Sequence, residues 1–123
     1  MGGYDLIAYG GNAEDVVLMR AFADRRGGFF VDVGAGEPVS GSLTKNLVDG
    51  LGWRGVNVEP LPERHARLRR ARARDVNLRV AVGDSPGSTT FFRVARAGED
   101  GWRRPQHAAQ GRAGAASRGR LAA

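Results

Sequence analysis

Short apolar runs along the first 94 residues predict four β-strands. They cover Phe29–Val33, Val56–Val58, Val76–Val82 and Thr89–Val94. Runs of this length, rich in valine and phenylalanine and bounded by turn-forming residues, are typical of buried strands. The turn at Asp84–Gly87, which contains serine, proline and glycine, separates the last two.

Helical spacing of apolar residues precedes the first strand and fills the next two intervals between strands. In the second of these three stretches leucines recur every fourth residue, and glycines end the first two. Asn12 and Ser42 are suitable N-caps for these two stretches, and Pro62 is suited to a first helical position. The predicted helices run from Asn12 to Gly27, from Ser42 to Gly52, and from Pro62 to about Arg72.

The alternation of strands and helices predicts an α/β fold with a parallel sheet, right-handed crossovers and flanking helices. The chain has 123 residues, which allows one domain at most. We divide it into an N-terminal helical flank (1–26), a partial domain (27–94) and a tail (95–123).

The tail differs sharply in composition from the rest. Twenty of its 29 residues are Ala, Gly or Arg, and Trp102 and Leu121 are its only large apolar residues. Such a stretch buries too little surface to offset the entropy of ordering, so we expect disorder. Three interpretations of the tail stay open. It is a solvated tail, a basic arm for RNA or an acidic partner, or the product of out-of-frame translation, which we favour. Eighteen of the 19 basic residues are arginine, which suggests GC-rich codons.

The net charge of +6 is not evidence for nucleic-acid binding, because it is concentrated at one end. Residues 1–94 carry 13 basic and 11 acidic side chains, and the tail carries six arginines and two acids. The arginines of the third predicted helix are expected to form a solvated face. A basic module that uses this helix and the tail is kept as the alternative function. The arginines in and just after this helix are Arg64, Arg67, Arg69, Arg70, Arg72 and Arg74.

Several other classes of protein are excluded. The chain has no cysteine, so it has neither a disulfide framework nor a Cys-based zinc site. Its two histidines are 42 residues apart, and we predict no metal site; His65 is expected to be a packing or surface residue. No apolar run approaches the ~18 residues of a membrane span, and the N-terminus lacks the pattern of a signal peptide. We therefore expect a cytoplasmic protein without membrane contact.

The strongest candidate for chemistry is the loop that follows the first strand. Asp32 is followed by Gly34, Ala35 and Gly36 at the carboxyl end of a buried strand, where glycine lets a ligand approach the backbone. A dinucleotide site would have a third glycine at the start of the helix. Here Glu37 and Pro38 follow instead: Glu37 would repel a phosphate and Pro38 has no N–H. The loop therefore suits a ligand without phosphate, although a plain strand-to-helix turn remains the alternative.

Two further carboxylates end later strands. Glu59 ends the second strand 23 residues after Gly36, and a carboxylate there can accept hydrogen bonds from both hydroxyls of a ribose. Asp84 follows the third strand and could bond an adenine amino group, or could equally start an Asx turn.

These blocks together resemble the FkbM-type methyltransferases over about residues 8–94. The resemblance lies in Gly11–Asp15, Phe29–Gly36, Ser42–Asn46, Gly52–Pro60 and Asn77–Asp84, with Gly52–Pro60 the most specific. It implies a class I, Rossmann-like fold that binds S-adenosylmethionine. By this likeness Asp32 and the loop Gly34–Gly36 hold the methionine part, Glu59 holds the ribose and Asp84 lies near the adenine. The implied reaction is methylation of a hydroxyl on a sugar, polyketide or other small metabolite.

The resemblance ends at Val94, before the strands that would complete this fold. The first strand would then lack its second neighbour, and the wall for the methyl acceptor would be missing. No catalytic residue is assigned. We expect an incomplete, inactive fragment that self-associates or needs a complementary C-terminal chain, and we do not expect nucleic acid as a partner.

Overall fold

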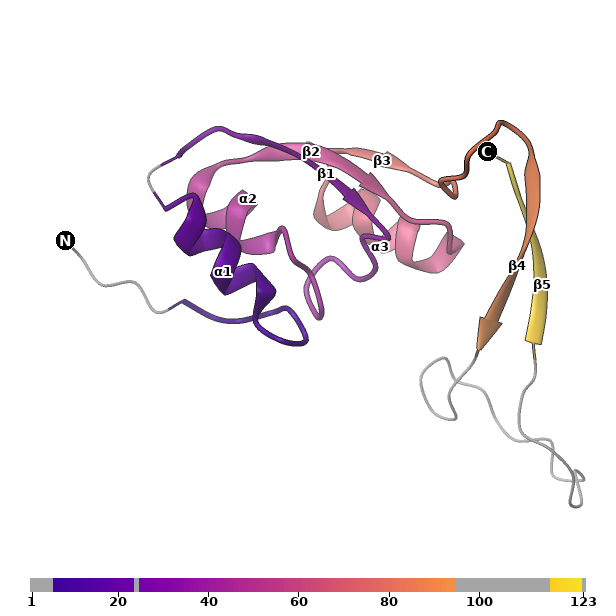
Figure 1. Ribbon diagram of the computed structural model, residues 1–123, viewed down its shortest axis with the longest axis horizontal. Coiled ribbons are helices and arrows are strands. Elements are labelled where there is room, and N and C mark those ends of the chain that lie inside the picture. The colour runs from indigo at the N-terminus through magenta and orange to yellow at the C-terminus, as the bar shows by residue number, and fades with distance from the viewer. Residues whose placement is uncertain (1–5, 24, 95–115, 123) are drawn as a thin grey trace, which may run out of the picture. The chain divides into compact units, whose positions relative to one another are not determined.

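The computed structural model describes residues 6–23, 25–94 and 116–122. The chain divides into two units, Met1–Val82 and Gly83–Ala123. The first unit holds a three-stranded parallel sheet in the order β1-β2-β3 with three helices (Figure 1). Its elements are α1 (Glu14–Ala21), β1 (Phe29–Val33), α2 (Lys45–Leu51), β2 (Arg54–Val58), α3 (Pro62–Ala71) and β3 (Val76–Leu78). The predicted α/β fold with a parallel sheet and flanking helices is therefore confirmed.

One end of α2 and one end of α3 follow the sequence signals, whereas α1 is shorter than predicted and ends at Ala21 rather than at Gly27. Gly52 caps α2 in the left-handed conformation (φ 67°), and Pro62 occupies the first turn of α3, as predicted. The N-cap at Asn12 is wrong: Ala13 (φ 59°) precedes α1. The side chain of Asn12 instead donates a hydrogen bond to the Glu14 carboxylate, as does its backbone N–H.

Ser42 contributes to α2 from a position outside the helix. Thr44 is the N-cap residue, but its side chain makes no capping hydrogen bond. The Ser42 Oγ accepts a hydrogen bond from the Lys45 N–H at 3.2 Å, which satisfies one of the free amides of the first turn. Ser42 is therefore a capping side chain, as predicted, although the helix begins three residues later.

The core lies between the sheet and the helices, all of which are on the same face of the sheet (Figure 1). One cluster comprises Met19 of α1, Phe30 of β1, Leu47 and Leu51 of α2, and Trp53. Leu68 of α3 is 2% exposed. Phe30 points into this core because alternate residues of a strand face opposite sides of the sheet.

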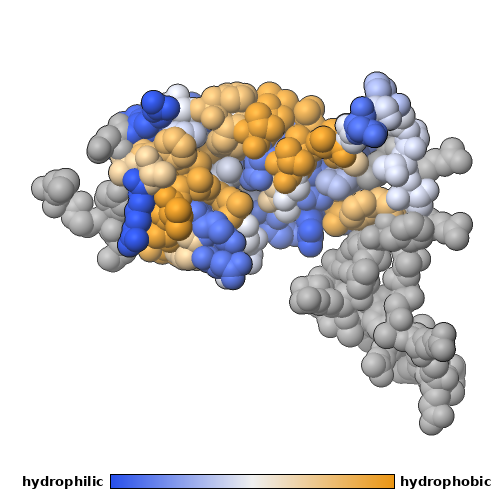
Figure 2. Space-filling model, in the orientation of Figure 1, coloured by the Kyte–Doolittle hydropathy of each residue, from blue (hydrophilic) through white to orange (hydrophobic). Residues whose placement is uncertain are grey.

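The opposite face of the sheet is apolar and exposed. Phe29, Val31 and Val33 of β1 are 66%, 62% and 61% exposed. The strand register places Val31 beside Val56 and Val56 beside Val76, so these side chains form a continuous row. Figure 2 shows apolar surface over the strands. Within the described residues, β1 also pairs on one edge only.

An exposed apolar face next to an open strand edge is expected to cause association between chains. The substitution Val31→Lys places a charge in the middle of this face, on an edge strand that tolerates lysine. We expect sedimentation velocity to show oligomers for the parent chain and a shift toward monomer for Val31→Lys. Val17→Lys is the matched control, because Val17 is 64% exposed on α1. A parent chain that stays monomeric, or equal effects of both substitutions, would contradict the expectation.

The second unit contains a two-stranded antiparallel sheet of β4 (Ser88–Val94) and β5 (Ala116–Ala122). The predicted strand Thr89–Val94 is therefore present, but it does not belong to the parallel sheet. The structure differs from the expected disorder at β5, because antiparallel pairing supplies backbone hydrogen bonds whatever the side chains are. Residues 95–115, the rest of the predicted disordered tail apart from Ala123, lie outside the described residues. The third predicted strand is also shorter than expected and ends at Leu78 rather than Val82.

Candidate functional site

The carboxyl ends of β1 and β2 bring together most of the predicted site residues. The parallel register pairs Asp32 with Asn57 and Val33 with Val58, so Asp32 and Glu59 lie at the same edge of the sheet. The N–H groups of Gly34 and Ala35 both donate to the Val58 carbonyl oxygen, at 2.8 and 3.1 Å. The loop after β1 therefore folds over the end of β2.

The two glycines of this loop are needed for their backbone conformation. Gly34 and Gly36 have φ angles of 77° and 68°, in the left-handed region that residues with a Cβ rarely adopt. A Cβ built on Gly34 would meet no atom within 4 Å. The loop therefore has an open side at Gly34, where a ligand can approach the backbone.

Glu59 holds the loop against the second strand. Its side chain is buried at 3% exposure. Its Oε2 accepts a hydrogen bond from the Gly36 N–H and its Oε1 accepts one from the Leu61 N–H, both at 2.8 Å. The sequence pattern predicted a ligand-binding role for Glu59 but not this internal one. Each carboxylate oxygen can accept a second hydrogen bond, so both roles are compatible.

Asp32 is a partly buried carboxylate with one hydroxyl donor. Thr44 Oγ1 donates to its Oδ2 at 3.4 Å. Burial raises the pKa of Asp32 above its ordinary value, the Thr44 hydrogen bond and the charge of Arg72 lower it, and the charge of Glu59 raises it further. Since burial outweighs the stabilising partners, a cation next to Asp32 would bind favourably.

Glu37, directly after the glycine loop, is ion-paired. Arg67 of α3 donates to both of its carboxylate oxygens, at 2.8 and 2.6 Å, and Arg64 Nε lies 3.6 Å from it. Glu37 therefore repels a phosphate less than the sequence predicted, because the two arginines compensate its charge. The missing N–H of Pro38 and the absence of a third glycine still disfavour a pyrophosphate.

Arg72 was expected on a solvated face, and this is wrong. Its side chain is 5% exposed and pairs with the buried Asp75 at 3.7 Å. The helical period contained the signal: Leu68, one turn earlier, faces the core, so residue 72 lies on the same side. With Arg72 buried and Arg67 paired to Glu37, α3 does not present the uniform basic face that the nucleic-acid alternative needs.

Two further sequence candidates have hydrogen bonds of their own. Asp84 belongs to the second unit, where Ser85 Oγ donates to its carboxylate at 3.1 Å. His65 contacts the Asn77 carbonyl oxygen through Nε2 at 3.0 Å, in accord with a packing role. Among the described residues, no three His, Cys, Asp or Glu side chains cluster in a way that could hold a metal ion. Over the same ranges, no helix has the length and apolar character needed to cross a membrane.

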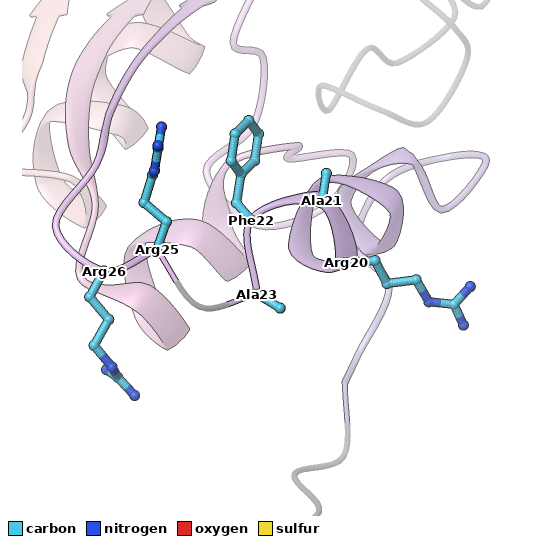
Figure 3. Close-up of a pocket in the computed structure, with 6 residues that line it drawn as sticks. All are labelled: Arg20, Ala21, Phe22, Ala23, Arg25 and Arg26. Carbon is cyan, nitrogen blue, oxygen red and sulfur yellow. The ribbon is translucent and has the colours of Figure 1, made fainter.

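A hollow of about 660 Å³ lies at the end of α1, away from the loop. Three arginines contribute to it, but Figure 3 shows Arg20 directed away from Arg25 and Arg26. Diverging guanidinium groups do not focus positive charge on one ligand, so we assign no anion site here. The lining residues are Arg20, Ala21, Phe22, Ala23, Arg25 and Arg26.

The sequence model of the methyltransferase FkbM domain matches residues 32–121. The chain belongs to the FkbM methyltransferase family. The match begins at Asp32 and includes the glycine loop and Glu59. It also extends past Val94, beyond the residues that carry the FkbM resemblance in the sequence, and so covers β4 and nearly all of β5. This does not favour out-of-frame translation of the tail, which stays a prediction. Searches of curated proteins and of solved structures gave no match to the chain.

Proposed function

We propose that this FkbM-family chain binds S-adenosylmethionine as methyl donor, for transfer to a hydroxyl group of a sugar or other small metabolite. The observation that carries the proposal is the loop Gly34–Gly36, which lies between Asp32 and Glu59 at the carboxyl edge of the sheet. In open α/β sheets this edge is where ligands bind.

The residues of the loop fit the chemistry of this donor. S-adenosylmethionine carries a cationic sulfonium and an ammonium group and has no phosphate. The Asp32 carboxylate, whose burial is incompletely compensated, suits the cationic methionine part. The open side of Gly34 admits close approach of the ligand, and the remaining lone pairs of Glu59 suit the ribose hydroxyls. We assign Asp84 to the adenine only as a proposal, because it belongs to the second unit.

When bound, this donor would supply an electrophilic methyl group on a positively charged sulfur. The described residues of the chain would bind and orient this donor: Asp32 attracts the cation, the backbone at Gly34 lets the donor approach closely, and Glu59 holds the loop in place. No residue of the site is assigned as a base for the acceptor hydroxyl.

We further propose that the chain alone has no turnover. Holding acceptor and donor in near-attack geometry contributes about 7–11 kcal/mol to catalysis. The parallel sheet of the described residues has only three strands, which leaves few residues to form the wall that would hold the methyl acceptor. A complementary C-terminal chain would supply the missing wall, whereas self-association would only cover the exposed face.

Titration calorimetry of the full chain with S-adenosylmethionine tests donor binding. We expect measurable binding by the parent and an affinity about 10- to 100-fold lower for Asp32→Asn, since a charged hydrogen-bonded partner contributes about 1.5–3 kcal/mol. Affinity should also fall on acidification, starting above the ordinary titration range of aspartate, because the raised pKa of Asp32 makes it lose its charge early.

Glu14→Gln is the matched control, because Glu14 is an exposed acid on α1 whose carboxylate bonds Asn12, outside the glycine loop. The same removal of one negative charge there should leave affinity unchanged. Absence of binding by the parent would refute the donor proposal, and equal losses in both variants would remove Asp32 from the site.

A further inference from the structure

We infer that Arg72 is a positioning residue for the donor site, which holds the far end of the glycine loop and orients Asp32 through the hydroxyl of Thr44. The inference rests on the proposed function, because the loop and Asp32 are its proposed binding elements. Arg72 lies just after α3, far along the chain from the residues that it contacts.

The guanidinium of Arg72 makes a distinct set of contacts with the segment between β1 and α2. Its Nη2 donates to the Pro38 carbonyl oxygen at 3.2 Å and to Ser42 Oγ at 3.1 Å. Its Nη1 donates to Thr44 Oγ1 at 3.5 Å. A planar guanidinium with several fixed donors can hold three such acceptors at once, which a lysine cannot.

Thr44 connects Arg72 to the site. Its hydroxyl accepts the hydrogen bond from Arg72 and donates its own proton to Asp32 Oδ2 at 3.4 Å. Because the Thr44 proton is directed at Asp32, Arg72 and Thr44 together orient the Asp32 carboxylate and stabilise its charged form. Thr44 is 6% exposed, so water does not readily replace it.

The loop is thereby held at both ends by buried charged side chains. Glu59 binds the Gly36 N–H at the near end. Arg72 binds Pro38 and Ser42 at the far end. The segment has no strand or helix of its own between Gly34 and Thr44, so these side-chain contacts add to its few backbone hydrogen bonds, such as that from the Gly41 N–H to the Tyr9 carbonyl oxygen.

The charges around Asp32 support this role. Glu59 and Arg72 are the charged groups that act on Asp32, with opposite effects on its pKa. Burial lowers the pKa of Arg72, and the charges of Asp75, Asp49 and Asp32 offset this only in part. Without Arg72, Glu59 would remain as the charged neighbour, and the pKa of Asp32 would rise further.

The test uses the full chain with Thr44→Val, Arg72→Met and Arg72→Lys. Arg69→Met serves as control because Arg69 is exposed on the last turn of α3, one turn before Arg72. The first measurement is the NMR titration of the Asp32 carboxyl in the cofactor-free protein. The second is the affinity for S-adenosylmethionine as a function of pH.

We expect Thr44→Val and Arg72→Met to raise the titration midpoint of Asp32 and to weaken binding about tenfold or more, with the loss on acidification starting at higher pH. Arg72→Lys keeps the charge without the planar fork, so it should restore the midpoint more fully than the affinity. Arg69→Met should change neither quantity.

An unchanged Asp32 midpoint together with unchanged affinity in Thr44→Val overturns the inference. Thr44→Val decides the matter if Arg72→Met does not fold, because the Thr44 side chain makes no capping bond to α2. A parent chain that binds no S-adenosylmethionine refutes the proposed function. The Asp32 midpoint, measured without ligand, then still supports or overturns the positioning role of Arg72.

Discussion

Glu59→Ala is expected to lower the free energy of unfolding by about 3 kcal/mol or more and to abolish measurable donor binding. The substitution leaves two backbone donors, the N–H groups of Gly36 and Leu61, without their carboxylate acceptor. Hydrogen bonds to a charged group contribute about 1.5–3 kcal/mol each. Since small domains have a total stability of only about 5–15 kcal/mol, the loss should be evident in urea denaturation.

The effect on binding should exceed the effect of removing a ribose contact alone. Without Glu59 the Gly36 end of the loop is released from β2, so the proposed donor site loses its shape as well as an acceptor. We expect calorimetry to show at least a 100-fold loss of affinity, which corresponds to about 2.7 kcal/mol.

Glu59→Gln tests how much the charge of this side chain contributes to holding the loop. Glutamine keeps the size and one acceptor oxygen, but its NH₂ group would face one of the two backbone N–H groups. Its stability should therefore lie between those of the parent and Glu59→Ala. If Glu59→Ala is as stable as the parent and still binds the donor, both the loop-holding and the ribose assignments are wrong.

Gly55→Val is expected to destabilise the first unit by about 3 kcal/mol or more, at the upper end of the range for overpacking. A Cβ at position 55 would lie 2.3 Å from the Phe30 carbonyl oxygen and 2.5 Å from the Phe30 ring. The oxygen belongs to the backbone of the paired strand β1, so it cannot move without breaking the sheet. Thermal or urea unfolding followed by circular dichroism measures the loss.

Gly11→Ala is the control for this substitution. A Cβ at Gly11 would meet nothing within 4 Å, so its effect on stability should be small. Gly28→Ala should fall between the two, because its Cβ would clash with the ring of Trp53, a side chain that has some freedom to shift. Equal stabilities of Gly55→Val and Gly11→Ala would contradict the close packing of β1 on β2.

The strands and helix boundaries that could be predicted were those with strong local signals. The apolar run Phe29–Val33 forms a strand with the predicted bounds because valine and phenylalanine favour extended backbone and all five residues pair with β2. Gly52 and Pro62 mark helix ends because their backbone conformations are restricted in ways that one residue alone decides. Asp32, Gly34 and Gly36 could also be singled out, because they follow one another at the carboxyl end of a predicted buried strand.

The predictions that failed did so for different reasons. The side chain of Asn12 bonds the nearby Glu14 carboxylate instead of capping α1, and β3 stops at Leu78. The failure at Arg72 depended on contacts between distant segments. Arg72 is buried because Pro38, Ser42 and Thr44, some 30 residues earlier in the chain, surround its guanidinium. No local pattern contains these partners, although the spacing from Leu68 to Arg72 indicated which way the side chain would face.

The sequence by itself determined the order of strands and helices and the placement of Asp32, the glycine loop and Glu59 at strand ends, because periodicity and backbone preference act locally. Only the tertiary structure decided how those residues are held. The Gly36 N–H reaches Glu59, the Thr44 hydroxyl reaches Asp32, and Arg72 reaches the far end of the loop. Each of these hydrogen bonds joins residues at least 12 positions apart, so they form only when the sheet and α3 pack together.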